Sequence, residues 1–140
     1  MSEDITERGI KFFEETMGPE RAKHFRAGME GTGFGSAMGK LAADFAFGSV
    51  WTRDGLERKQ RSLIVIGALI ALRAGDELKN HFRIGLANGL TAREIEEAII
   101  QAVPYVGFPA TAQAMGAAIE VLREAGIDTT TKTSHEQGLL

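Results

Sequence analysis

Two side chains with acid–base chemistry share one face of a predicted helix. Glu77 and His81 are four residues apart, and this spacing places them side by side on a helix surface. The neighbouring stripe of the same segment is apolar, with Leu78, Phe82 and Leu86. Histidine exchanges protons near neutral pH, and an adjacent carboxylate can orient its ring or raise its pKa. The pair is a candidate proton-transfer site, although a plain surface pair on an amphipathic helix has the same spacing.

Three arginines stand around the start of a long apolar segment. They are Arg53, Arg58 and Arg61. A guanidinium group holds a carboxylate through two parallel hydrogen bonds, and a helix N-terminus adds a partial positive charge. The group predicts either a site for an organic anion or a solvated basic turn.

Two aromatic residues lie beside predicted turns. Trp51 and Tyr105 each combine a flat ring with a polar tip, which suits the wall of a binding pocket. Core packing is the alternative use of both. His24 and His135 have no evident partner in the sequence, and we expect no function for either. The chain contains no phosphate-binding glycine loop, HExxH zinc motif or nucleophile elbow, so neither a metal site nor a cofactor is expected.

Capping residues, glycines and prolines divide the chain into the helices that must position these side chains. Thr91 with Glu94 has the spacing of a capping box, and Pro104 is expected to interrupt the helix that follows it. We find no strand pattern, so the predicted fold is all-α with about six to seven helices. The expected helices cover residues 4–17, 19–30, 38–51, 56–73, 76–88, 91–103 and 110–124.

The fourth of these helices carries apolar residues around its whole circumference, most densely from Leu63 to Leu72. Such a helix is expected to be buried on every side. A small domain does not readily surround one helix completely. Two arrangements fit this pattern: a central helix ringed by the others, or a helix that presents part of its surface to another subunit.

Length and composition restrict the class of protein. The chain has 140 residues, 44% hydrophobic and 25% charged, with a formal net charge of −3. We expect one domain over residues 1–128, a polar and disordered tail over 129–140, and no binding to nucleic acid or membranes. The polar start of the chain predicts no signal peptide, and the longest apolar run is too short to cross a bilayer, which favours the cytoplasm. The absence of cysteine excludes thiol chemistry and disulfides.

Several short motifs follow one another in a fixed order. Together they resemble the carboxymuconolactone decarboxylase family, from about Glu7 to Glu124 and most strongly from Phe47 to Ala110. Each motif is weak alone, and the ordered series is specific. The motifs are Trp51-Thr52-Arg53-Asp54-Gly55-Leu56, Arg61-Ser62-Leu63, Glu77-Leu78 with His81, Asn88-Gly89-Leu90-Thr91, Glu94-Ile95 and Tyr105-x-Gly107-x-Pro109-Ala110.

The wider superfamily that this resemblance implies includes the alkylhydroperoxidase D-like proteins. These use a Cys-x-x-Cys pair followed by a histidine four residues after the second cysteine. If His81 is that histidine, Ala74 and Glu77 stand at the cysteine positions. Neither side chain can replace a thiolate, so the resemblance is to the branch without peroxidase chemistry.

The resemblance implies a compact multi-helix, alkylhydroperoxidase D-like domain that assembles as a homo-oligomer, a trimer or a hexamer. It also implies a carbon–carbon lyase that decarboxylates 4-carboxymuconolactone in the protocatechuate branch of aromatic catabolism. Asp54 stands where proline is usual, Pro104 precedes the tyrosine, and residues 17–36 look dissimilar. These departures motivate two alternatives: an enzyme of biosynthesis that acts on another cyclic or aromatic small molecule, and a non-catalytic helical oligomer that binds a small molecule.

The implied reaction needs no cofactor, because the substrate carries its own electron sink. Loss of carbon dioxide leaves electrons that flow through a double bond into the lactone carbonyl as a dienolate. Arg53 or Arg61 would hold the acetate arm. Tyr105 or an arginine would stabilise the lactone oxygen, and His81, supported by Glu77, would deliver the proton to carbon.

Overall fold

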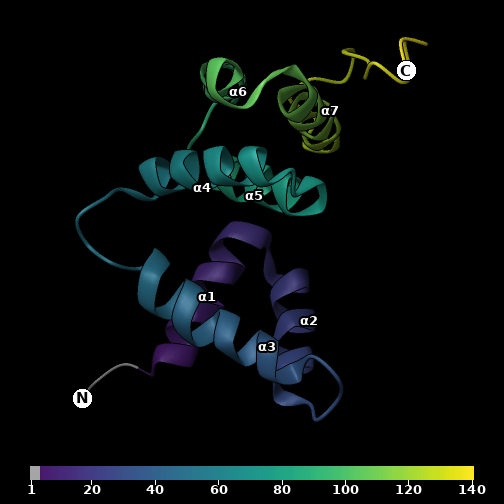
Figure 1. Cartoon of the computed structure of the whole chain (residues 1–140). Coiled ribbons are helices and arrows are strands. Elements are labelled where there is room, and N and C mark those ends of the chain that lie inside the picture. The colour runs from purple at the N-terminus through teal and green to yellow at the C-terminus, as the bar shows by residue number, and fades with distance from the viewer. Residues whose placement is uncertain (1–3) are drawn as a thin grey trace. The chain divides into compact units, whose positions relative to one another are not determined.

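The computed structural model describes residues 4–140, which form helices joined by short turns, without a strand among them (Figure 1). This confirms the all-α prediction. The chain divides into two compact units, residues 1–58 and 59–140, which we describe separately. The elements are α1 (Ile5–Met17), α2 (Pro19–Glu30), α3 (Ser36–Leu41), η1 (Ala42–Trp51), α4 (Arg58–Leu72), α5 (Gly75–Ala87), α6 (Ala92–Val106) and α7 (Phe108–Glu124).

In the first unit, α1 and η1 approach each other through glycines. A Cβ atom at Gly9 would overlap the backbone carbonyl oxygen of Ala43, and one at Gly48 would overlap that of Ile5. Beside this contact lies an aromatic cluster in which Phe12 stacks on Trp51 at 5.1 Å between ring centroids. The cluster consists of Phe12, Phe13, Phe25, Phe47 and Trp51.

The segment predicted as one α-helix over residues 38–51 consists of the short helix α3 followed by the π-helix η1. The prediction of α geometry along this whole segment is therefore wrong. The Ser49 hydroxyl donates to the carbonyl of Asp44, five residues earlier, as the wider π turn permits. Residue spacing does not distinguish the two geometries, because a π turn adds only one residue to the hydrogen-bonded ring.

In the second unit, α5, α6 and α7 pack around one apolar core, to which α4 contributes Ile66 and Ile70. The α7 side of this core consists mostly of alanine, which allows close helix packing. On the other side of α4, Ile64 is 61% exposed and Leu72 is 74% exposed. The helices of the second unit therefore do not by themselves surround α4 completely.

The termini of α6 differ in how well local signals predict them. The capping box at its start is present: the Thr91 hydroxyl accepts from the Glu94 backbone N–H, and the Glu94 carboxylate accepts from the Thr91 backbone N–H. The predicted interruption at Pro104 is wrong, because α6 continues to Val106. Pro104 lies in the last turn, where its missing N–H removes only one hydrogen bond near the helix end.

After α7, residues 125–140 form turns instead of a helix. Arg123 donates to the Glu136 carboxylate at 2.7 Å, and Asp128 accepts from the backbone N–H groups of Thr130 and Thr131. A disordered tail and a single domain over residues 1–128 both stay predictions. No helix within residues 4–140 is long and apolar enough to cross a membrane.

Candidate active site

The candidate proton donor lies on the inner edge of α5. Leu78 and Phe82 of this helix are fully buried in the core of the second unit. The His81 side chain is only 13% exposed, whereas that of Glu77 is 61% exposed, and 4.0 Å separates His81 Nε2 from Glu77 Oε2. The helix therefore holds an imidazole close to the core and leaves its carboxylate neighbour in water.

Burial controls the proton affinity of this histidine. It lowers the pKa of His81 below its ordinary value of 6.5, and the opposing attraction of Glu77 is smaller. Glu77 does raise the pKa of His81, as the sequence predicts, but the effect of burial is larger, so the net shift of this pKa is downward. A neutral imidazole presents one donor and one acceptor. An anionic ligand beside it would favour the charged form, so binding of a carboxylate would protonate this ring.

The three arginines predicted to form a cluster differ in their surroundings. Arg58 donates to the Glu15 carboxylate at 2.7 Å and lies 4.8 Å from the centroid of the Phe12 ring, so it serves the first unit. Arg53 is exposed in the turn between η1 and α4. Arg61 is half-buried on α4, and its Nε atom is shielded from water. Of the three, Arg61 belongs to the same unit as His81.

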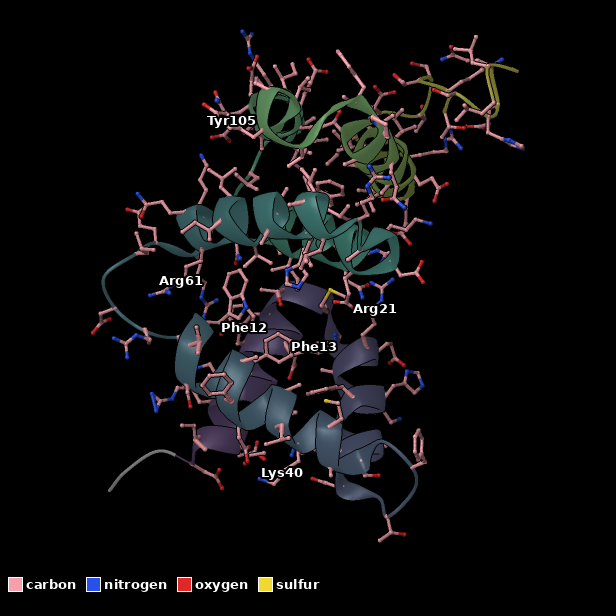
Figure 2. All side chains as sticks on the ribbon, viewed as in Figure 1. Phe12, Phe13, Arg21, Lys40, Arg61 and Tyr105 are labelled. Carbon is pink, nitrogen blue, oxygen red and sulfur yellow. The ribbon has the colours of Figure 1, made fainter. Side chains whose placement is uncertain are left out.

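The two predicted aromatic residues also differ. Trp51 is 7% exposed and stacked on Phe12, so its use is core packing, the alternative that the sequence left open. Tyr105 is 82% exposed and borders an apolar groove of about 400 Å³ between α4 and α6. Figure 2 shows Tyr105 at α6 and Arg61 beside the start of α4, well apart from each other.

The residues predicted to form the site therefore come from both units. Trp51 and Arg53 belong to the first unit, and Arg61, Glu77, His81 and Tyr105 to the second. Glu77 and His81 lie side by side on α5, with 4.0 Å between His81 Nε2 and Glu77 Oε2. A hollow of about 1160 Å³ in the second unit, between α5, α6, α7 and the tail, contains none of these side chains in its wall.

Two polar residues that sequence reasoning did not select meet between α4 and α5. Ser62 is fully buried, and its Oγ accepts a hydrogen bond of 3.0 Å from Nδ2 of Asn88. The available signal was a serine that interrupts the apolar surface of α4. Asn88 belongs to one of the motifs of the family resemblance, but asparagine before glycine is also ordinary at a helix end, so no role was assigned to it.

Within residues 4–140, no group of three or more His, Cys, Asp or Glu side chains could hold a metal ion. The charged or titratable side chains of the candidate site in the second unit are His81 and Glu77 on α5 and Arg61 on α4.

Comparison with known proteins adds to this geometry. The chain is 37% identical to a 4-carboxymuconolactone decarboxylase of Acinetobacter baylyi over 86% of its length and 88% of the relative. It is 38% identical to a nitrosuccinic acid decarboxylase of Metarhizium robertsii, over 79% and 76% of the two chains. It is also 34% identical to an uncharacterized 15.0 kDa protein of Paracoccus denitrificans, over 86% and 97%.

The family comparison agrees with the ordered motifs. Residues 36–120 match the model of the carboxymuconolactone decarboxylase family. This range includes α4, α5 and α6, and with them His81, Glu77 and Arg61. The chain belongs to the carboxymuconolactone decarboxylase family.

Proposed function

We propose that this chain is a cofactor-free decarboxylase of a small carboxylic acid, with 4-carboxymuconolactone as the first candidate substrate. The observation that carries the proposal is the position of His81, a largely buried imidazole beside Glu77. Two relatives named as decarboxylases support it. A decarboxylase must replace the departing carboxylate by a proton, and histidine suits that task near neutral pH.

The two named substrates have a common chemical core. In nitrosuccinic acid, one carbon carries the nitro group, a carboxyl group and a –CH2–COOH arm. In 4-carboxymuconolactone, one ring carbon carries a carboxyl group and the same arm, and is bonded to a carbon–carbon double bond that is conjugated to the lactone carbonyl. We infer that the substrate class is a succinate whose reacting carbon is attached to an electron acceptor.

The reaction on this core balances without an added oxidant, metal or cofactor. The bond between the reacting carbon and its carboxylate breaks, carbon dioxide leaves, and the electron pair moves into the acceptor. A proton then adds to carbon: next to the carbonyl in the lactone, or at the reacting carbon in the nitro acid. We assign this proton to His81, protonated when the anionic substrate binds.

Arg61 is the proposed ligand of the retained carboxylate. It stands on α4 in the same unit as His81, and its half-buried guanidinium would strengthen a charge-assisted hydrogen bond. Arg53 remains the second candidate for this role. Tyr105 remains the candidate donor to the acceptor oxygen, and an exposed phenol would need cover from water for that role.

A homo-oligomer, a trimer or a hexamer, is part of the proposal. Ile64 and Leu72 leave apolar surface of α4 exposed, and the groove beside Tyr105 is apolar as well. Contacts with second copies of the chain would cover this surface and would remove Tyr105 from water. Light scattering at micromolar concentration tests the assembly, and a mass equal to one chain would contradict it.

The decisive experiment offers both substrates to the purified protein. Release of carbon dioxide with loss of the lactone's ultraviolet absorbance supports the first candidate. Turnover of nitrosuccinate alone supports the second, which the relative from Metarhizium robertsii motivates. If neither acid is consumed while calorimetry detects binding of either, the chain is a binding protein and the proposed catalysis is wrong.

A further inference from the structure

We propose that Ser62 and Asn88 are positioning residues that set the spacing between Arg61 on α4 and His81 on α5. The inference rests on the proposed function, because it assigns a role to residues that contact neither substrate nor reacting atoms. Its basis is the hydrogen bond of 3.0 Å from Nδ2 of the half-buried Asn88 to Oγ of the fully buried Ser62.

Each partner of this bond is tied to one functional side chain. Ser62 directly follows Arg61 on α4, so any movement of one moves the other. Asn88 follows His81 by seven residues, about two helical turns, and so lies on the same face about 10 Å further along the helix axis. The bond therefore connects the backbone beside Arg61 with the face of α5 that carries His81.

Backbone hydrogen bonds of the turn after α5 hold Asn88 in place. The Asn88 backbone N–H donates to the Ile84 carbonyl at 2.9 Å, and the Leu90 N–H donates to the Gly85 carbonyl at 2.9 Å. Gly89 adopts a φ of 101°, which glycine tolerates without strain. The side chain of Asn88 thus extends from a turn that is bonded directly to the end of α5.

Lys59 at the start of α4 pairs with Glu94 on α6 at 2.7 Å, whereas the contribution of α4 to the core that it shares with α5 is apolar. Ile66 and Ile70 pack in the same core as Leu78 and Phe82. Apolar contacts are not directional, so they resist separation of two helices more than a small displacement along their axes. A hydrogen bond tolerates only a few tenths of an ångström. We therefore assign the axial register of α4 on α5 to the Ser62–Asn88 bond.

Register matters because catalysis depends on placement. An error of about 1 Å between reacting groups can reduce a rate about a hundredfold. Ser62→Ala keeps the size of the buried side chain nearly unchanged and removes the acceptor. The proposal expects this variant to fold, with kcat reduced between about tenfold and a hundredfold at a temperature well below its melting transition.

The matched control is Thr111→Val on α7. Thr111 is 4% exposed, and its hydroxyl donates only to the carbonyls of Gly107 and Phe108 on its own helix. Thr111→Val therefore removes a buried hydroxyl from the same unit without touching the α4–α5 register. It should change the melting temperature but leave kcat and KM within about twofold of the unchanged chain, since local hydroxyl bonds do not place the site.

Two further measurements separate positioning from general destabilisation. The double variant Ser62→Ala, Asn88→Ala should lose no more activity than the more damaged single variant, because both changes break one bond. The NMR titration of the His81 ring, without substrate, should shift in Ser62→Ala and stay unchanged in Thr111→Val.

The outcomes distinguish this inference from the proposed function. If the chain decarboxylates a substrate, the kinetics of Ser62→Ala test the inference. A kcat within about twofold of that of the unchanged chain is well short of the expected loss and overturns the inference. If the chain consumes neither acid, the proposed function fails and the His81 titration decides. An unchanged titration in Ser62→Ala then overturns the inference, and a shift specific to that variant supports it.

Discussion

The two units use similar side chains for different purposes. In the first unit, Trp51 stacks on Phe12, and Arg58 lies over the same ring while it pairs with Glu15. In the second unit, His81 is largely buried on α5 and Arg61 is half-buried on α4, while the core consists of aliphatic side chains, alanines and Phe82. The same types of side chain thus build a stacked cluster in one unit and stand outside the apolar core in the other.

The cores differ in the same way. Ring pairs with centroids 4.6 to 6.0 Å apart build the first unit, together with two glycines that bring α1 against η1. The second unit combines close helix packing with buried polar groups, among them Ser62, Thr111 and the largely buried His81. The comparison places the stacked rings in the first unit and the buried imidazole in the second.

The largest effect should come from the second unit. His81→Ala is expected to reduce kcat for the confirmed substrate by about a hundredfold to ten-thousandfold, the usual contribution of a positioned acid. The variant should retain its helical circular dichroism, because the ring contributes little to the core. Glu77→Gln is the matched change, and it should cost less, since it alters the environment of the ring without removing it. Activity of His81→Ala within about threefold of the unchanged chain would show that another residue is the acid.

The next effect should come from the glycine contact of the first unit. Gly9→Ala forces a Cβ against the carbonyl oxygen of Ala43, and such overpacking costs about 1–3 kcal/mol or more in free energy of unfolding. Gly28→Ala on α2 is the control, because a Cβ there meets no atom within 4 Å. That substitution should stabilise the chain by about 0.5–1 kcal/mol. Urea unfolding measures the free energy of unfolding of both variants. Equal changes for Gly9→Ala and Gly28→Ala would contradict the close contact at Gly9.

A smaller effect should appear in the pH dependence of stability. Burial lowers the pKa of His81 below 6.5 in the folded chain, so below pH 6.5 the unfolded chain binds this proton more readily. The stability that the folded chain gains from keeping His81 neutral is therefore fully present above pH 6.5. It is lost as the pH falls toward the lowered pKa of His81 in the folded state. Urea unfolding on both sides of this window should show the decrease, and His81→Gln should remove it. Identical profiles for the two proteins would contradict the burial of the ring.

The smallest effect should come from Arg58. Its ion pair with Glu15 is partly exposed, and such pairs contribute about 0–1 kcal/mol. Arg58→Met should therefore change the free energy of unfolding only slightly and leave KM unchanged. Arg61→Met should instead raise KM for the anionic substrate, as the proposed carboxylate ligand. Equal KM values for the two variants would remove Arg61 from the site and leave Arg53 as the candidate.

Local sequence signals are enough to predict where several helices of this molecule begin. Asp4 caps α1 through the Thr6 N–H, Pro19 begins α2, and the Thr91–Glu94 box begins α6, because each acts within a few residues. The spacing of Glu77 and His81 placed both on one helix face for the same reason. The ordered motifs identified the family, and the absence of cysteine excluded its thiol chemistry.

Tertiary structure decided how each of these side chains is used. The burial of Trp51, the pairing of Arg58 with Glu15 and the bond between Ser62 and Asn88 join residues far apart in the chain. No local rule contains such contacts, since they exist only after helices have packed. The depth of His81 has the same origin: spacing places it on a face of α5, and the surrounding core determines how much water reaches it and hence the direction of its pKa.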